Sequence, residues 1–346
     1  MKLRNATKNI FLLVISCTFS LVMLEAGVRV YQYGFDSLLP HIMDSVHNLG
    51  TSGLIRASDH PEIIYELKPN VSTYFKKTKF ATNTQGLRDK DYKMQKNSNT
   101  FRVAVIGDSF TLPAGIPIEN AYHSLLEKRL AREYQNREIE FINFAVGGYN
   151  LRQYAAVLEH KVISYNPDLI LIGFCAHNDW LEEKEYVENR LSQKPYKVKP
   201  VSHPFFELHS VTLIKKLLGN MGTTIFQKMP DRSSDSNERL NQDHRVYMDA
   251  MFGRIHKLAE SKGAHVVVVA LDIRPLEPNL LAFLESLAEK HKFWFLDATQ
   301  AFRNMAASQF CIYQADCHPN EKANQIFADQ IYSFLTNLRD QGKIEF

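Results

Sequence analysis

Four short segments of this chain contain the residue types that acyl transfer at an ester requires. In chain order they lie at 107–110 (Gly-Asp-Ser-Phe), 147–150 (Gly-Gly-Tyr-Asn), 176–179 (Ala-His-Asn-Asp) and 316–320 (Asp-Cys-His-Pro-Asn). Together they supply a serine, a glycine backbone amide, an asparagine side chain and a histidine with a carboxylate beside it. A serine hydroxyl becomes a useful nucleophile only when a base removes its proton. The segments therefore indicate nucleophilic catalysis at an ester carbonyl.

The candidate catalytic residues are Ser109, His318 and Asp316. Histidine removes a proton near neutral pH, and a carboxylate assists it by fixing the tautomer and stabilising the imidazolium. We predict that Ser109 is the nucleophile, His318 the base and Asp316 the orienting acid. A serine after a strand can also simply cap the next helix, and a lone His-Pro in a loop implies no role. The presence of all four segments in this order favours catalysis.

A second group of residues is predicted to stabilise the negative charge that develops on the carbonyl oxygen. The backbone amides of Ser109 and Gly148 and the side-chain amide of Asn178 form the predicted oxyanion hole. A well-aimed donor of this kind stabilises the transition state by about 3 kcal/mol. The alternative roles are a plain turn for Gly148 and a helix cap for Asn178. For the neighbouring Asp108 and Asp179 we predict structural hydrogen bonds within their loops.

The stretches between these segments alternate between strand and helix patterns. Five continuously apolar runs, typical of strands buried on both faces, lie at 102–106, 140–145, 169–174, 266–271 and 293–296. Helical periodicity covers 119–135, 151–165, 238–262 and 277–291, and a last helix begins near Pro319. This alternation predicts βαβ units and therefore an α/β fold with a central parallel sheet of about five strands.

The predicted sheet gives an independent reason to group the candidate residues. In open parallel sheets, ligands bind beyond the carboxyl ends of the strands. Ser109, Gly148 and Asn178 follow the first, second and third predicted strands. The sheet alone should therefore bring these three residues to one edge, whereas His318 must be brought there by the rest of the fold.

In type, motif and order, Ser109, Gly148, Asn178 and His318 resemble the four residues that give the SGNH superfamily of GDSL-type hydrolases its name. The resemblance extends over about 101–338. It implies a flavodoxin-like three-layer α/β/α sandwich, activity on esters or acyl groups, and no cofactor.

Three details accompany this resemblance. The acid of the family commonly lies three residues before the histidine, where this chain has Ala315; Asp316 lies two before, as in members that end in Asp-x-His-Pro-Asn. The asparagine segment of the family usually opens with glycine, and here the residue is Ala176. The segment 83–89, followed by a linker into the serine strand, is similar to membrane-anchored members.

The N-terminus is predicted to form a transmembrane helix. An uncharged apolar run, 10–24, follows the basic residues Lys2, Arg4 and Lys8, and with its flanks it is just long enough to cross a bilayer. Basic residues on the short N-terminal side place that end in the cytoplasm and the remaining chain in the periplasm or at the cell surface. A cleaved signal peptide is the main alternative and would give a secreted protein. Lipidation at Cys17 is less favoured because that residue lies inside the apolar run.

These observations divide the chain into three parts. Residues 1–30 form the predicted membrane anchor or signal segment, 31–99 a connecting region with short strands, and 100–342 the SGNH hydrolase domain. Within this domain, 180–237 contains no convincing strand and is rich in lysine, proline and polar residues. Because it directly follows the Asn178 loop, it is interpreted either as a lid or substrate-binding insertion or as a surface elaboration without substrate contact.

Composition and charge narrow the class of partner. The 346 residues are 45% hydrophobic and 23% charged, as in ordinary globular proteins, and the net charge of +3 is too small to indicate a nucleic-acid partner. The basic cluster 76–79 (Lys-Lys-Thr-Lys) is interpreted as a solvated face. Cys317 could pair with Cys311 or with Cys175, or all three could be free thiols. The sequence has no cysteine and histidine spacing typical of zinc sites.

Together these features predict an extracytoplasmic serine esterase or acyltransferase held at the membrane by its N-terminal helix. The predicted substrates are ester-linked acyl groups, with acetyl groups of a cell-surface polysaccharide as the favoured example. A lipid or lysophospholipid esterase is the nearest alternative enzyme, and a catalytically silent glycan-binding scaffold is the alternative from another class. Water and a sugar hydroxyl would use the same catalytic residues, so the sequence does not separate hydrolysis from transfer.

Overall fold

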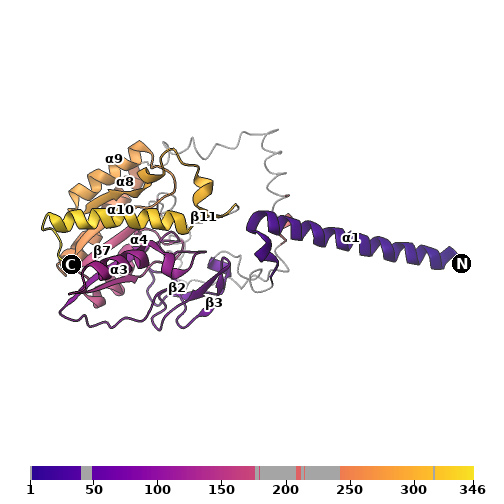
Figure 1. Ribbon diagram of the computed structural model, residues 1–346, viewed down its shortest axis with the longest axis horizontal. Coiled ribbons are helices and arrows are strands. Elements are labelled where there is room, and N and C mark those ends of the chain that lie inside the picture. The colour runs from indigo at the N-terminus through magenta and orange to yellow at the C-terminus, as the bar shows by residue number, and fades with distance from the viewer. Residues whose placement is uncertain are drawn as a thin grey trace.

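The computed structural model of the chain describes residues 2–39, 49–175, 179, 208–211, 214, 242–314 and 316–346. Asn178 of the predicted oxyanion hole and most of the predicted insertion 180–237 lie outside these residues. The described chain forms an α/β unit from which one long N-terminal helix projects (Figure 1).

At the centre of the described residues lies a five-stranded parallel sheet, which confirms the predicted fold class. Its strands are β5 (Thr100–Gly107), β6 (Glu138–Asn143), β7 (Leu169–Phe174), β8 (His265–Ala270) and β9 (Trp294–Asp297). They stand in the order β6-β5-β7-β8-β9, and every neighbouring pair is parallel. All residues of β5 and β7 are buried. This burial on both faces is the physical reason for the continuous apolar runs in the sequence.

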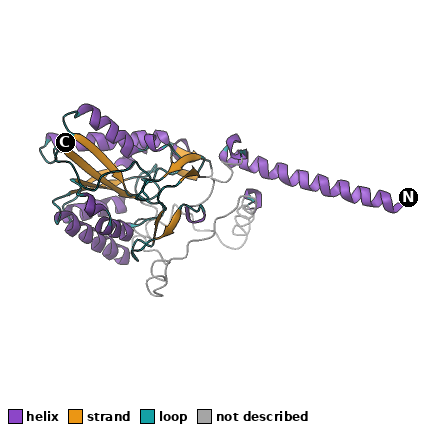
Figure 2. Cartoon of the chain, turned by 90° about the horizontal axis from the view of Figure 1, so that it is seen from below, coloured by secondary structure: helices purple, strands orange, loops and turns teal. Residues whose placement is uncertain are grey.

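Helices cover both faces of the sheet and complete three layers (Figures 1 and 2). One face packs against α4 (Leu151–His160), α8 (Gln242–Glu260) and α9 (Pro278–Lys290). The other face packs against α3 (Tyr122–Glu133) and α10 (Glu321–Asp340). The layers therefore follow the α/β/α arrangement that alternating strand and helix patterns predict.

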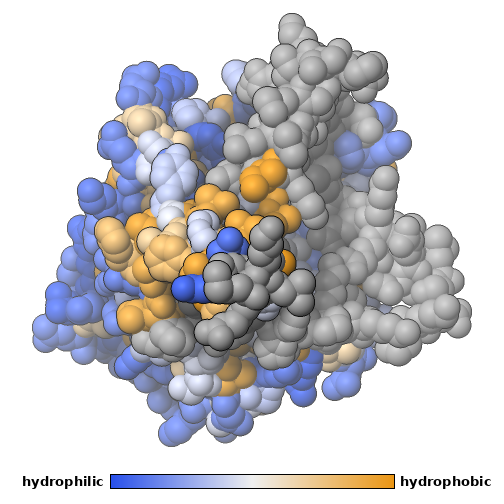
Figure 3. Space-filling model, turned by 90° about the vertical axis from the view of Figure 1, so that its right-hand side faces the viewer, coloured by the Kyte–Doolittle hydropathy of each residue, from blue (hydrophilic) through white to orange (hydrophobic). Residues whose placement is uncertain are grey.

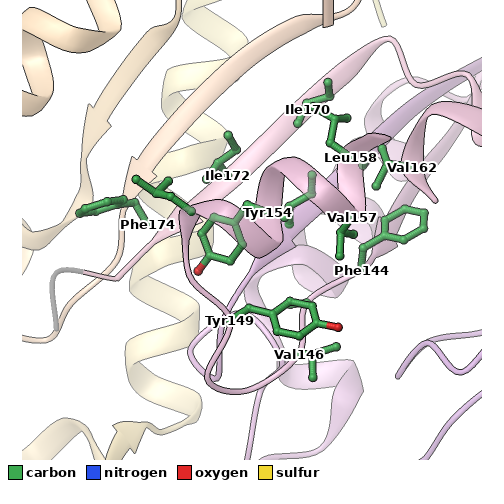
Figure 4. Packing of buried hydrophobic residues seen from close by; sticks show 14 of the residues in the cluster. Phe144, Val146, Tyr149, Tyr154, Val157, Leu158, Val162, Ile170, Ile172 and Phe174 are labelled. Carbon is green, nitrogen blue, oxygen red and sulfur yellow. The ribbon is translucent and has the colours of Figure 1, made fainter. Parts of the chain in front are cut away.

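Side chains of β5 alternate between the two cores of this sandwich. Ala104 and Ile106 join the core beneath α4, whereas Val103 and Val105 join the core beneath α3 and α10. Figure 4 shows part of the first core, in which Tyr154 and other side chains of α4 lie against β7. The period of two along the strand thus supplies both faces of the sheet with apolar surface.

Local sequence features set the boundaries of α4. The Asn150 side chain accepts hydrogen bonds from the first backbone amides of the helix, and the Gln153 side chain accepts one from the Asn150 amide (3.2 Å). The helix ends at His160, and Val162–Tyr165 forms a separate 3₁₀ turn. The predicted helix 151–165 is therefore correct in place but too long by its last turn.

Two antiparallel hairpins precede the sheet in the chain. One pairs β1 (Ile55–Ala57) with β2 (Tyr65–Leu67), and the other pairs β3 (Ser72–Phe75) with β4 (Thr78–Ala81). Their apolar side chains, including Phe75, belong to the same buried cluster as the sheet face beneath α4. Residues of the predicted connecting region therefore pack directly onto the hydrolase core.

The N-terminal helix α1 (Lys2–Tyr33) projects away from the sheet (Figures 1 and 2). Its part Thr7–Tyr33 contains a window of mean hydropathy 2.1 and is long and apolar enough to cross a membrane, which is consistent with a signal peptide or an anchor. Large apolar side chains from Ile10 to Leu24 are exposed. Figure 3, viewed from the side on which α1 projects, shows apolar residues gathered at the centre of this face.

Candidate active site

Ser109 lies in the tight turn that follows β5. The Asp108 carboxylate accepts a hydrogen bond from the amide of Phe110 (2.8 Å), and the Asp108 carbonyl accepts one from the amide of Leu112 (2.8 Å). These bonds confirm the structural role predicted for Asp108. They hold Ser109, which is partly buried, at the carboxyl end of β5.

The serine turn packs tightly against the neighbouring strand. A Cβ atom at Gly107 would lie 2.3 Å from Oγ1 of Thr111, and one at Gly173 of β7 would lie 2.2 Å from the same atom. Only glycine at these two positions leaves room for Thr111 between the strand ends. The Thr111 hydroxyl is hydrogen-bonded to the Tyr122 hydroxyl at 3.1 Å, so α3 also holds the turn.

A buried arginine braces the chain beyond the serine. The guanidinium of Arg88 donates hydrogen bonds to the carbonyls of Leu112 (2.9 Å) and Ile116 (2.8 Å). Burial lowers the pKa of Arg88 to about 10, which still leaves the group charged at neutral pH. Arg88 belongs to the segment 83–89, so this segment contributes a support for the loop that carries Ser109.

The turn that contains Gly147 and Gly148 follows β6 and lies beside the serine. Gly148 has a φ of +83°, a conformation that favours glycine. The hydroxyl of Tyr65 donates a hydrogen bond to the Gly147 carbonyl (2.9 Å), and a Cβ atom at Gly148 would lie 2.7 Å from the same hydroxyl. Tyr149 in turn donates to the Tyr65 carbonyl (2.6 Å). Any other residue at position 148 would therefore disturb both the backbone and Tyr65.

The hairpin of β10 (Cys311–Tyr313) and β11 (Asp316–Pro319) carries the candidate acid and base. Nδ1 of His318 donates a hydrogen bond to Oδ1 of Asp316, and the His318 amide donates to the same oxygen (3.3 Å). Burial alone would raise the pKa of Asp316, but the hydrogen bond and charge of His318 and the charge of Lys76 outweigh it. They hold the pKa of this carboxyl well below its usual range. The carboxylate is therefore ionised and able to orient the imidazole.

A disulfide between Cys311 and Cys317 closes the same hairpin, which selects one of the pairings left open by the sequence. Cys175, at the end of β7, is a buried free thiol, and Cys17 on α1 is an exposed one. Since position 317 lies between the candidate acid and base, the cross-link is built into the strand that carries both. Across the described residues, no cluster of three or more His, Cys, Asp or Glu side chains is arranged to hold a metal ion.

One cavity of about 270 Å³ is lined by Ser109, Gly147, Gly148 and His318. Its remaining walls come from residues that precede the sheet and residues that follow the serine: Leu49, Gly50, Tyr65, Phe75, Lys76, Leu112 and Ala114. Three of the four predicted SGNH residues thus share one cavity, and the fourth lies outside the described residues. A larger hollow of about 780 Å³ contains neither the serine nor the histidine, so size alone would not locate this site.

Among the described residues, no hydrogen bond joins the Ser109 hydroxyl to His318. The serine hydroxyl instead donates to Oδ2 of Asp108 at 3.5 Å, the outer limit of such a contact. The ring of Phe110, the residue after the serine, lies 5.8 Å from the His318 ring. Catalytic hydrogen bonds are often long in free enzymes and tighten when substrate binds. For the predicted role as nucleophile, the serine hydroxyl must rotate away from Asp108 so that it can donate to the imidazole.

The sequence did not identify Lys76 as a site residue. The interpretation of 76–79 as a solvated face is wrong for Lys76, which is 8% exposed, although Lys79 is exposed as expected. The Lys76 ammonium forms an ion pair with Oδ2 of Asp316. These two residues are 240 positions apart, so no local pattern could indicate the contact.

Asp179 makes buried structural hydrogen bonds, as predicted. Its carboxylate accepts from the amide of Cys175 (2.6 Å) and from the hydroxyl of Tyr154 (2.9 Å). Burial and, to a lesser extent, the nearby charge of Asp108 raise the pKa of Asp179 well above its usual value. The end of β7 is thereby fastened to α4 at the same edge of the sheet as the serine turn.

A parallel α/β sheet with a serine and a histidine–carboxylate pair at one cavity is the arrangement of a serine hydrolase. Residues 105–326 match the GDSL-like Lipase/Acylhydrolase family. The match covers well over half of the chain and includes Ser109, Gly148 and His318. The chain therefore belongs to this SGNH family of enzymes, which act on esters.

Several solved structures resemble the chain at low sequence identity. The esterase EstA of Pseudoalteromonas sp. is 14% identical with a TM-score of 0.43, over 70% of this chain and 100% of that one. A two-domain esterase active on acetylated mannans is 14% identical with a TM-score of 0.45, over 71% of this chain and 52% of that one. An acetylxylan esterase of Geobacillus stearothermophilus is 13% identical with a TM-score of 0.40, over 69% and 95%. No curated protein sequence matches the chain.

Proposed function

We propose that the chain is a membrane-anchored, extracytoplasmic serine esterase or acyltransferase that forms a covalent acyl-enzyme at Ser109. The observation that carries this proposal is the single cavity shared by Ser109, Gly148 and His318, with Asp316 hydrogen-bonded behind the imidazole. Family membership supplies the reaction class, since SGNH enzymes act at ester carbonyls. Ser109 and Gly148 follow the strands β5 and β6, and Asp316 and His318 lie on the β10–β11 hairpin.

In the proposed mechanism, Oγ of Ser109 attacks the ester carbonyl carbon while its proton passes to Nε2 of His318. The amides of Ser109 and Gly148 and the side chain of Asn178 hold the negative oxygen, each by about 3 kcal/mol in a favourable geometry. His318 then gives the proton to the leaving alcohol, and the acyl group remains on the serine. Water or an acceptor hydroxyl, activated by the same imidazole, attacks the acyl-enzyme and restores Ser109. Asp316 stabilises the imidazolium in both halves.

The size of the cavity supports a short acyl group such as acetyl. Its volume of about 270 Å³ lies below the usual range for small-molecule sites, roughly 300–1,000 Å³. Leu112 and Ala114 provide apolar walls near the serine, which suit a methyl group better than a polar substituent. We propose acetyl esters of a cell-surface polysaccharide as the substrate class.

The second candidate is a lipid or lysophospholipid esterase. The observation that favours it is contact between the end of α1 and two hairpins that border the cavity, β3–β4 and β10–β11. The Lys77 ammonium donates to the Tyr33 carbonyl (2.5 Å), and the side-chain amide of Gln314 donates to the Tyr31 hydroxyl (2.9 Å). A site beside a membrane-spanning helix could receive its substrate from the bilayer. The small cavity argues against a long acyl chain, which places this candidate second.

The contacts of α1 also support its retention as an anchor. Arg29 is buried and ion-paired with Glu25 (2.8 Å). The Glu25 carboxylate also accepts hydrogen bonds from the amides of His209 and Ser210, at 3.0 and 2.9 Å. Cleavage that removed Glu25 would take these charged and hydrogen-bonded contacts away from His209 and Ser210, which is costly where the groups are shielded from water. The two amides belong to the predicted insertion 180–237, most of which lies outside the described residues.

Labelling with a fluorophosphonate probe tests the proposed function, because the probe reacts covalently with an activated serine. We expect the full chain in detergent to be labelled, Ser109→Ala to be unlabelled, and Ser124→Ala, a matched change on α3, to be labelled like wild type. Folded wild type that resists the probe would instead support the silent scaffold. Turnover of aryl acetate compared with aryl octanoate separates the two enzymatic candidates, since the small cavity should favour acetate.

A further inference from the structure

We infer that Lys76 is a positioning residue for the catalytic pair, because it fixes the Asp316 carboxylate that orients His318. This inference rests on the proposed function of the pair. The two carboxylate oxygens are divided between two partners: Oδ1 accepts from Nδ1 of His318, and Oδ2 is ion-paired with Nζ of Lys76. A carboxylate held at both oxygens cannot rotate without losing one charge-assisted contact. Lys76 therefore limits the orientations that Asp316 can impose on the imidazole.

The Lys76–Asp316 pair is shielded from solvent, unlike an ordinary surface salt bridge. The two side chains are 10% and 18% exposed. Exposed ion pairs contribute little to the free energy of unfolding. Removal of one partner from a buried pair, in contrast, leaves the other charge uncompensated. Burial raises the pKa of Asp316, but the contacts of His318, followed by those of Lys76, hold it below its usual range. Loss of the lysine should therefore change both the pKa and the orientation of the Asp316 carboxylate.

The backbone of the β3–β4 turn supports the same role. Lys76 and Lys77 are the two residues between the paired strands, and their φ angles are +47° and +66°. Asn and Gly are preferred in such turns, because a left-handed backbone costs other residues about 1–2 kcal/mol each. Lysine at both positions is expected where the side chains make compensating contacts. Lys76 reaches Asp316, and Lys77 reaches the carbonyl of Tyr33.

Comparison of the titratable groups around the pair identifies Lys76 as the lysine that contacts the Asp316 carboxylate. From β10, the Tyr313 hydroxyl donates to the Lys76 carbonyl and so holds the turn against the catalytic hairpin. The Lys77 ammonium lies 4.9 Å from the centre of the Tyr313 ring, and the centre of the Tyr33 ring of α1 lies 5.7 Å from the centre of the Tyr313 ring. Of these neighbouring titratable groups, Lys76 is the one in ionic contact with Asp316.

The test compares the pH dependence of kcat/KM for an aryl acetate in wild type, Lys76→Met, Lys76→Arg and Lys79→Met. Lys79→Met removes an exposed lysine from the same hairpin and is the matched control. Lys76→Met should lower kcat by about 10- to 100-fold with little change in KM, as small misplacements of a catalytic group do.

The midpoint of the acid limb reports the titration of the His318–Asp316 pair. In Lys76→Met it should rise by about one pH unit, because a cation that opposes protonation is lost. Lys76→Arg should restore the midpoint and most of kcat, and Lys79→Met should match wild type. Asp108, which faces the serine, is unchanged in every variant.

Lys76→Gly separates the loss of the ion pair from a folding defect, because glycine suits the left-handed turn better than lysine. This variant should fold and still show the raised midpoint. An unchanged midpoint in both Lys76→Met and Lys76→Gly, or an equal shift in Lys79→Met, would overturn the inference. An inactive wild type would instead reject the proposed function. In that case NMR titration of the His318 ring protons in the same variants still decides whether Lys76 acts on the pair.

Discussion

The side chains of His318 and Asp316 should contribute unequally to catalysis. Asp316→Asn keeps an imidazole that can accept the serine proton, whereas His318→Ala removes the base itself. We expect the loss of kcat in Asp316→Asn to be about a hundredfold smaller than in His318→Ala, the difference found between acid and base in a serine protease. Steady-state turnover of a small aryl acetate measures both losses. An equal or greater loss in Asp316→Asn would reject this ranking.

The lowered pKa of Asp316 also predicts how stability depends on pH. Burial raises this pKa, but the contacts with His318 and Lys76 prevail, so the folded-state value lies below the unfolded value of about 3.9. The stabilisation is therefore fully present above about pH 4 and is lost as the pH falls through the folded-state pKa. Urea unfolding at decreasing pH should show a steeper decline for wild type than for Asp316→Asn. Parallel declines would show that the carboxylate is not selectively stabilised in the folded state.

At the scale of single residues, the type and order of the motif residues located the candidate serine and histidine, and both lie next to a regular element. Ser109 follows a buried strand, and His318 precedes a helix that begins after Pro319. Lys76 and Tyr65 gave no comparable signal, since their partners lie in remote parts of the chain. The roles of all these residues remain predictions until the variants are measured. Asn178 likewise remains a sequence-based prediction.

At the scale of elements, apolar periodicity located the strands and helices but not all of their ends. The second predicted strand, 140–145, ends in the structure at Asn143. The Asn143 side chain accepts a hydrogen bond from the amide of Ala145 (3.0 Å) and donates one to the carbonyl of Thr111 (3.1 Å). Phe144 and Ala145 are apolar because they are buried, not because they continue the strand. A hydropathy pattern records burial, and it does not mark the residue at which a strand ends.

The β10–β11 hairpin should lose rigidity when its disulfide is absent. In Cys311→Ser with Cys317→Ser, the lost loop closure should lower the free energy of unfolding by about 2 kcal/mol. His318 should also be held less firmly, so kcat/KM should fall by about tenfold. Thermal unfolding and aryl acetate turnover measure the two effects.

Reduction of the wild-type protein provides the control for this prediction. Dithiothreitol should bring wild type to the level of the double variant and leave the double variant itself unchanged. Cys17→Ser, which removes an exposed thiol of α1, should behave as wild type. Full activity of the reduced wild type would show that strand pairing alone positions His318.

At the scale of the whole molecule, the contacts of α1 determine where the cavity lies relative to a bilayer. Most of the large exposed apolar side chains of α1 lie between Ile10 and Leu24, and the helix continues to Tyr33. This segment adds about 14 Å at the usual helical rise. Its end contacts both the β3–β4 turn, through Lys77, and the β10–β11 hairpin, through Gln314. Both hairpins lie at the end of the molecule from which α1 projects (Figure 1). Both also border the cavity, so a retained anchor would hold the cavity close to the membrane surface.

Fluorescence quenching by lipid headgroups tests this placement in vesicles that contain the full chain. A fluorophore attached to the cysteine of Lys79→Cys, in a Cys17→Ser background, should be strongly quenched by nitroxide-labelled headgroups. The same fluorophore at Asp340, at the far end of α10, should be quenched much less (Figure 1). Both positions are exposed, so the comparison reports distance from the bilayer and not burial. Equal quenching at the two positions would mean that the hydrolase does not keep its contacts with α1 in the membrane, and the cavity would then be free to act on substrates away from the surface.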